Sequence, residues 1–179
     1  MKKFFKKFFK NKSKIKDEAY KTIILPKIIE FSRVVKTKET ISFMHYGHLG
    51  DIINSLPIIK ELSKTKICNL YIQKNKKIPD HVVSKEHPFG SVYLTENAIL
   101  KMLPLLKNQK FINKVEIYDD QKIDIDLNFF RELPINFNID SVRWYFHLTG
   151  CFPDLSNNYL EVNSHDKYNN YIVIMRSLR

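Results

Sequence analysis

Two of the four glycines in this 179-residue chain lie in one short stretch, HYGHLGD, together with two histidines and an aspartate. Gly47 permits a tight turn, and Gly50 lets the backbone approach a ligand where the amides of a following helix attract negative charge. The imidazoles of His45 and His48 can bind a phosphate or a sugar hydroxyl, although His45 can equally support the loop through hydrogen bonds. Asp51 can either cap the helix amides or act as a general base.

The stretch lacks the motifs of two common nucleotide-binding loops. It contains no G-x-G-x-x-G, and no G-K-[ST] follows it, which disfavours dinucleotide-binding and P-loop proteins. No serine lies in a nucleophile elbow and no histidine pair has metal-site spacing, so neither covalent hydrolase chemistry nor a metal is predicted. Asp124 and Asp126 resemble a D-x-D metal motif, but alternating aspartates on a strand more often form a solvated face. Arg131 and Arg176 are candidate anion partners, and for Arg131 a structural ion pair is the simpler interpretation.

A strand and a helix must position the glycine stretch. The run TISFMHY, rich in β-branched and aromatic residues, is typical of a buried strand. After the loop, Ile52, Leu56 and Ile59 recur at three- and four-residue spacing, which predicts a helix from about residue 51 to residue 63. Pro57 lies inside this pattern and should kink the helix, because proline lacks an amide donor.

The remaining segments alternate between strand and helix patterns. Residues 17–35 predict one or two short helices that divide at Pro26, and residues 95–106 and 139–148 predict further helices, the last ending at Gly150. Strands are predicted at KICNLYIQ, NKVEIYD and YIVIMR, and a further short strand or extended piece at KIDIDLNFF. This alternation predicts an α/β fold with a Rossmann-like, mainly parallel sheet and helices on both faces. The domain would span residues 39–179, after a basic extension at residues 1–38.

The net charge of +11 is concentrated at the N-terminus. Eight lysines and no acidic residue occur among the first 16 residues, so the remaining residues carry a net charge of only +3. This nearly neutral body lacks a basic stripe that could follow a phosphate backbone, which disfavours nucleic acid as a partner. The two cysteines lie far apart without C-x-x-C spacing, as expected for a reduced, intracellular protein.

The first residues alternate pairs of lysines with pairs of phenylalanines. At about 100° per residue, the phenylalanines would cover one side of a helix and the lysines the other. Such a helix can bind an anionic membrane surface, which predicts a cytoplasmic protein held peripherally at the inner face of the membrane. The alternative is a solvated segment that packs some phenylalanines on the domain. The predicted membrane-surface residues are Lys3, Phe4, Phe5, Lys6, Lys7, Phe8, Phe9 and Lys10.

The stretch HYGHLGDIINSLPIIKEL resembles the first strand, loop and helix of GT-B-fold glycosyltransferases, in particular the heptosyltransferase-like family, glycosyltransferase family 9. That family opens with a small strand, then a G-D pair, then an apolar helix containing a proline, here LGDIINSLP. Similarity to an uncharacterised branch of bacterial and phage-associated glycosyltransferases extends over HPFGSVYLTENAILKMLPLLKNQKFINKVEIYDDQKIDIDLNFFR and YIVIMRSLR. The resemblance covers about Ile41 to Arg179, and its widely shared motif is L-G-D-x-I-x-x-L-P.

The resemblance implies two Rossmann-like domains facing a cleft, the first binding the acceptor and the second binding the nucleotide-sugar donor. It implies that Asp51, in the L-G-D position, is the base that deprotonates the acceptor hydroxyl. It further implies a nucleotide sugar as co-substrate, with no metal or other cofactor. Because the sequence ends where the second domain would begin, we expect the donor half to come from a partner chain or to be lacking.

The predicted function is therefore sugar transfer to a cell-surface glycan, its precursor or a lipid-linked acceptor. The residues predicted to contact substrate, besides the base Asp51, are His45, Gly47, His48, Gly50 and Arg176. The alternative is a non-catalytic binding module at the membrane surface, derived from a glycosyltransferase.

Overall fold

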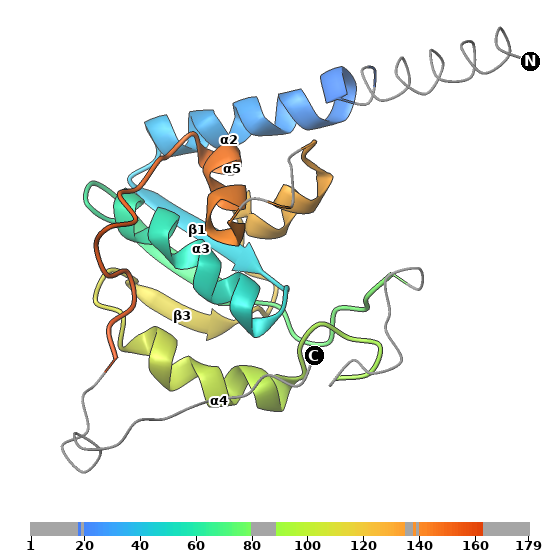
Figure 1. Ribbon diagram of the computed structural model, residues 1–179, viewed down its shortest axis with the longest axis vertical. Coiled ribbons are helices and arrows are strands. Elements are labelled where there is room, and N and C mark those ends of the chain that lie inside the picture. The colour runs from blue at the N-terminus through green and yellow to red at the C-terminus, as the bar shows by residue number, and fades with distance from the viewer. Residues whose placement is uncertain (1–17, 19, 80–88, 135–137, 139, 163–179) are drawn as a thin grey trace, which may run out of the picture.

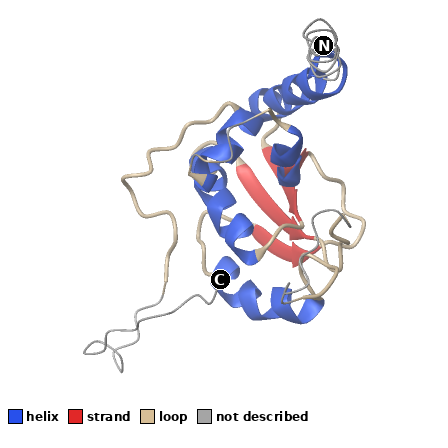
Figure 2. Ribbon diagram, turned by 45° about the vertical axis from the view of Figure 1, so that its right-hand side comes forward, coloured by secondary structure: helices blue, strands red, loops and turns tan. Residues whose placement is uncertain are grey.

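The computed structural model describes residues 18, 20–79, 89–134, 138 and 140–162. Within them, four parallel strands form one sheet in the order β3-β2-β1-β4. The strands are β1 (Thr40–His45), β2 (Ile67–Ile72), β3 (Lys114–Ile117) and β4 (Ile125–Asp126). Helices α2 (Leu25–Thr37), α3 (Leu49–Leu62) and α4 (Glu96–Lys107) flank the sheet (Figure 1, Figure 2). The predicted α/β class with a Rossmann-like parallel sheet is confirmed.

The two central strands carry the core. β1 pairs with β2 along its whole length, from Thr40 opposite Ile67 to His45 opposite Ile72. In β2 the side chains from Cys68 onward are all buried, as expected for a parallel strand covered on both faces. Helix α3 covers β1 with an apolar stripe that includes the fully buried Ile52, Leu56 and Ile59.

The order of the strands reverses at β1. From β1 the chain passes through α3 to β2 and through α4 to β3, whereas β4 pairs with the opposite side of β1. In open parallel sheets, the crevice beyond the carboxyl ends of the strands at such a reversal is where ligands bind. The loop after β1 and the segment after β4 diverge at this point, so the glycine stretch lies beside the expected crevice.

Helix α2 packs against the sheet domain through one face. The predicted division near Pro26 is present: a π-helical turn, η1 (Tyr20–Ile24), precedes α2, and Pro26 lies in the first turn of α2, where its missing amide costs nothing. Phe31 and Val34 are buried, and the Phe31 ring meets Phe129 edge-on with centroids 5.8 Å apart. α2 therefore packs against the sheet, although it lies within residues 1–38, which we predict to be an extension.

The structure corrects the start of the helix that follows the glycine stretch. α3 begins at Leu49 rather than near residue 51, so Gly50 lies in its first turn and not in the loop. The cause is the extended backbone of His48, which makes this residue the N-cap, with Asp51 at the third helical position. α3 also continues through Pro57 to Leu62.

Two later elements are shorter or tighter than predicted. The extended piece at KIDIDLNFF forms only two residues of β4, and then a 3-10 helix, η2 (Leu127–Glu132), begins because the Asp126 side chain accepts a hydrogen bond from the amide of Asn128. The helix expected at 139–148 is a 3-10 turn, η3 (Ser141–Tyr145), followed by α5 (Phe146–Thr149). It ends, as predicted, at Gly150, whose φ of +66° is left-handed.

Three predicted features lie outside the described residues: the Lys/Phe segment with Lys3 to Lys10, the strand YIVIMR, and Arg176. In the part of the chain that the structure describes, no helix is both long and apolar enough to cross a bilayer.

Substitutions on the buried and the exposed face of α2 should affect the free energy of unfolding to very different extents. Phe31→Ala should lower the free energy of unfolding by about 3 kcal/mol, because it removes a buried ring and leaves a cavity beside Phe129. Ile29→Ala, on the exposed face of the same helix, should change it by less than about 0.5 kcal/mol. Urea denaturation of both variants measures the difference, and equal effects would show that the packing of α2 is described wrongly.

Candidate functional site

An ion pair joins the two segments that diverge at the strand reversal. Arg131, on η2 after β4, donates from Nη2 to Oδ2 of Asp51, in the first turn of α3, over 2.7 Å. The two side chains are 25% and 19% exposed, so the pair is partly accessible rather than buried in the core. The Asp51 carboxylate is thus fixed between β1 and β4.

The Asp51 carboxylate also caps its own helix. The amide of His48 donates to Oδ2 over 3.1 Å, so the capping role expected for this aspartate is present. Among the described residues, both hydrogen bonds to this carboxylate end on Oδ2. Oδ1 therefore remains able to accept a hydrogen bond or a proton from a ligand, which keeps the general-base interpretation chemically possible.

Arg131 is held by polar and aromatic neighbours. Its Nη1 donates to the Asn128 side-chain oxygen over 3.2 Å, and its guanidinium lies over the rings of Phe130 and Tyr93, 4.3 Å and 5.2 Å from their centroids. The same Asn128 oxygen accepts from the amide of Tyr46 over 3.1 Å. Asn128 therefore ties the loop after β1 to η2, and Arg131 is oriented toward Asp51 by several contacts.

Below the ion pair, a buried chain of hydrogen bonds supports the loop. His45 is fully buried, and its Nδ1 accepts from the amide of Gly47 over 2.9 Å. Its Nε2 lies 3.0 Å from the Tyr145 hydroxyl, which donates to the backbone carbonyl of Asp51 over 2.8 Å. Since Nδ1 accepts, Nε2 carries the proton and donates to Tyr145, so His45 is a neutral imidazole in a defined tautomer.

The surroundings of His45 and Tyr145 shift the pKa of each group in the direction that favours its neutral form. Burial, followed by the nearby positive charge of Arg131 and by His48, holds the pKa of His45 well below its usual 6.5. Burial likewise raises the pKa of the Tyr145 phenol, and the charge of Asp51 adds to that effect. Both groups therefore remain neutral around pH 7 and act as fixed hydrogen-bonding supports.

The two glycines of the stretch play different parts. A Cβ at Gly47 would lie 2.7 Å from Asp51 Oδ2, 2.7 Å from His45 Cε1 and 2.8 Å from Arg131 Nη2. At Gly50 a Cβ would meet nothing within 4 Å. Gly47 is required because side chains crowd against it, whereas Gly50 adjoins open space at the beginning of α3.

Aromatic rings and a further cation form the rim of the crevice. Tyr93 packs against Tyr46 with ring centroids 5.7 Å apart and against His48 at 5.2 Å. Lys76 lies over the Tyr46 ring at 5.3 Å, and burial raises the pKa of that phenol to about 12. Aromatic faces beside hydrogen-bonding groups suit the flat, apolar side of a sugar ring as well as a base.

The structure brings together five of the residues predicted to act at the site. His45 lies beneath the surface in a supporting position, Gly47 and His48 line the turn, and Gly50 and Asp51 begin α3. Arg176 lies outside the described residues. Asp124, by contrast, pairs with Lys38 and accepts a hydrogen bond from the amide of Ser42, while Asp126 accepts twice from Asn128, so these aspartates serve local structure.

Several members of the site carried no signal in the sequence. Tyr145 is buried, and its hydroxyl is part of the network. Asn128 and Tyr93 were not singled out, because each lies far along the chain from the glycine stretch. The turn-initiating pair Asp126 and Asn128 is the one local pattern that hinted at a helix start after β4.

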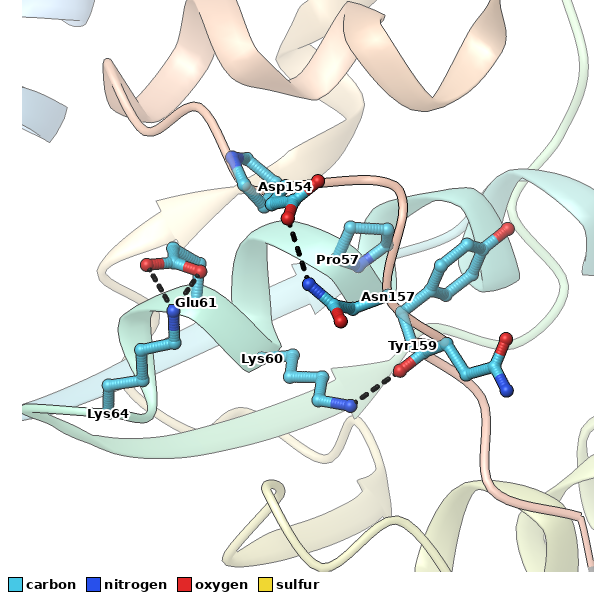
Figure 3. Close-up of a pocket in the computed structure, with 9 residues that line it drawn as sticks. Pro57, Lys60, Glu61, Lys64, Asp154, Asn157 and Tyr159 are labelled. Carbon is cyan, nitrogen blue, oxygen red and sulfur yellow. Dashed lines mark hydrogen bonds and ion pairs between the residues drawn. The ribbon is translucent and has the colours of Figure 1, made fainter.

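A separate pocket of about 300 Å³ lies on the second half of α3, away from Asp51 (Figure 3). Its polar groups bind one another: Lys64 pairs with Glu61, Lys60 donates to the carbonyl of Asn158, and Asn157 donates to Asp154. Figure 3 shows that Lys60 reaches from α3 to the segment at 153–159, whereas the other two pairs lie at the end of α3 and within that segment. The pocket is best explained by the packing of that segment on α3.

In comparisons with protein-family models, curated proteins and solved structures, no significant match to this chain is found. The glycosyltransferase resemblance therefore stays a prediction based on the residues quoted above. Within the described ranges, no group of three or more histidine, cysteine, aspartate or glutamate residues is arranged to hold a metal ion.

Alanine substitutions at Gly47 and Gly50 should have different effects on stability. Gly47→Ala should lower the free energy of unfolding by about 1–3 kcal/mol, because the added methyl group displaces the ion pair or His45. Gly50→Ala should leave stability unchanged or raise it by about 0.5–1 kcal/mol, since alanine favours the first turn of α3. Thermal unfolding of the two variants tests this, and a harmless Gly47→Ala would contradict the crowding.

The buried imidazole predicts a pH dependence of stability. The unfolded chain protonates His45 near pH 6.5, whereas the native chain does so only well below that pH. Because the unfolded state then binds more protons, stability should fall as pH decreases below 6.5, by up to about 1.4 kcal/mol per pH unit from this residue. Denaturation between about pH 7 and pH 5 measures the slope. His45→Gln should flatten it and His147→Gln, at an exposed position, should not.

Proposed function

We propose that this protein is a glycosyltransferase component that binds an acceptor saccharide at the carboxyl edge of β1 and β4, with Asp51 as the base. The L-G-D resemblance suggested this function, and the geometry of the crevice supports it. The chemical class is transfer of a sugar from a nucleotide sugar to a hydroxyl of a glycan, its precursor or a lipid-linked acceptor.

The observation that carries the proposal is the position of the Asp51 carboxylate. It lies at the strand reversal, partly exposed, fixed through Oδ2 by Arg131 and the His48 amide. A catalytic base must be held within hydrogen-bonding reach of its substrate, and Oδ1 is directed to no other described group. The open space at Gly50 and the rings of Tyr46 and Tyr93 supply room and a surface for a sugar.

In the proposed reaction, Oδ1 of Asp51 accepts the proton of an acceptor hydroxyl as that oxygen attacks the anomeric carbon of the nucleotide sugar. The bond between the anomeric carbon and the phosphate oxygen breaks, and the nucleoside diphosphate or monophosphate leaves with the bonding electrons. Arg131 acts as a positioning residue, because it holds the carboxylate in one orientation. We propose that the donor nucleotide sugar is bound outside this crevice, by a partner chain if not by this one.

A second candidate function is a saccharide-binding module without transfer. The observation that favours it is that Asp51 already has two complete structural roles, as helix cap and as partner of Arg131. In this case the crevice and its aromatic rim would bind a saccharide, and the carboxylate would only shape the site.

The first test is saccharide binding to the full ¹⁵N-labelled chain. Titration with glucose, galactose, mannose and N-acetylglucosamine should shift the amide resonances of Gly47 and Gly50 for at least one sugar. Absence of any such shift would contradict both candidate functions at this crevice.

The second test is transfer, measured with radiolabelled UDP-, GDP-, ADP- and CMP-sugars and isolated bacterial membranes as acceptor. Asp51→Asn should reduce transfer at least about 100-fold, since it removes the base but keeps the shape. Asp154→Asn, an aspartate of the separate pocket on the second half of α3, is the matched control and should retain transfer. Equal transfer by Asp51→Asn and the wild type would exclude the base, and saccharide binding with no transfer would favour the binding module.

A further inference from the structure

Helices η1 and α2 carry several apolar side chains that the other described residues leave exposed. Ile23 is 63% exposed and Ile29 59%, and Leu25 and Tyr20 are each exposed by more than a third. The opposite face of α2 is occupied, because Phe31 and Val34 pack into the core. At about 100° per residue, Leu25 and Ile29 lie on one side of α2, whereas Ile23 and Tyr20 on η1 point to other sides. Exposed aliphatic side chains on one side of a helix, as at Leu25 and Ile29, are typical of a surface that meets an apolar partner.

Basic residues continue the same stripe. At about 100° per residue, Leu25, Ile29, Arg33 and Lys36 fall within one narrow sector of α2, and both basic side chains are exposed. The acidic residue of the helix, Glu30, lies outside this sector and pairs with Lys27 over 2.8 Å. The outer stripe of α2 therefore combines exposed apolar groups with uncompensated positive charge.

The sequence immediately before this helix has the same chemistry. Residues 1–16 contain eight lysines and four phenylalanines and no acidic residue. We propose that the outer face of α2 (Leu25, Ile29, Arg33 and Lys36) binds the surface of an anionic lipid bilayer, as a continuation of the Lys/Phe segment. The aliphatic groups would enter the interface while the cations meet lipid phosphates.

Other partners fit this face less well. A nucleic acid would use the cations but would gain nothing from exposed aliphatic side chains. A second copy of the chain would bring two basic stripes together, and like charges oppose such a contact. An anionic bilayer is the one partner that satisfies the apolar and the basic groups at once.

The proposed surface leaves the crevice accessible. α2 lies at the outer edge of the molecule, and its beginning is on the same side as the carboxyl ends of the strands (Figure 1). A bilayer against the outer face of α2 would thus run alongside the sheet rather than over the end that holds Asp51. The proposal does not depend on sugar transfer, because lipid binding and transfer are measured separately.

The test is co-sedimentation of the full chain with vesicles of phosphatidylcholine alone or mixed with phosphatidylglycerol. The wild type should bind the mixed vesicles, and the variant Leu25→Ser with Ile29→Ser should bind at least about fivefold more weakly, because both aliphatic groups of the face are lost. Leu100→Ser is the matched control: this leucine is 52% exposed on α4, and its loss should leave binding unchanged.

The charges are tested in the same assay. Arg33→Gln and Lys36→Gln should each weaken binding to the mixed vesicles by about fivefold, and added salt should reduce the difference. If the double serine variant binds as tightly as the wild type and Leu100→Ser, α2 does not contact lipid and the proposal is wrong. Failure of the wild type to bind mixed vesicles would also overturn it, as would equally tight binding to duplex DNA that is independent of Leu25 and Ile29 and shows no preference for lipid.

Discussion

The site depends on the absence of a side chain at Gly47. Groups from β1, α3 and η2 converge on the volume that a Cβ would fill, each within 2.8 Å of it. Non-bonded carbon contacts are favourable only from about 3.5 Å, so this convergence is possible around a glycine alone. The close approach lets Asp51 meet Arg131 while His45 accepts from the turn itself. The reversal of strand order at β1 and the missing side chain at Gly47 together let His45, Asp51 and Arg131 form one compact polar cluster.

Beneath the ion pair, each hydrogen bond fixes the next. The Gly47 amide determines which nitrogen of His45 carries the proton, that proton is donated to Tyr145, and the Tyr145 hydroxyl in turn holds the Asp51 carbonyl. The network thereby joins β1, η3 and the first turn of α3. Because burial keeps His45 and Tyr145 neutral, it adds no charge that would compete with Arg131 for the carboxylate. Such a rigid support is suited to binding or catalysis, since little order has to be gained when a ligand arrives.

The sequence predicted what depends on neighbouring residues. Hydrophobic spacing gave β1, α3 and α4, and the glycine stretch pointed to the crevice before its strand order was known. The sequence did not predict the features that depend on contacts between residues far apart in the chain. The pairing of Arg131 with Asp51 spans 80 residues, and no local pattern announces it. The 3-10 helix η2 also escaped prediction, because the Asp126 cap starts it within a run whose composition favours a strand.

Contacts with distant residues also explain why α3 begins at Leu49 rather than near residue 51. An aspartate after a glycine is typical of an N-cap, yet here Asp51 lies at the third helical position and reaches back to the His48 amide. That arrangement requires His48 to be extended, which in turn depends on the turn at Gly47 and on the contact with Tyr93. Local preference and tertiary contact agree on the existence of the helix and disagree only on where it begins.

The proposed lipid-binding face and the crevice share no residue, but they are mechanically connected. Phe31, on the inner side of α2, contacts Phe129, two residues before Arg131 on η2. At the C-terminal end of the helix, Lys38 pairs with Asp124, which accepts from the Ser42 amide of β1. α2 is thus attached at its middle to η2 and at its C-terminal end, through Asp124, to β1. A surface bound to the outer face of α2 would consequently hold the crevice in a fixed orientation, because the helix cannot turn without disturbing η2 or β1.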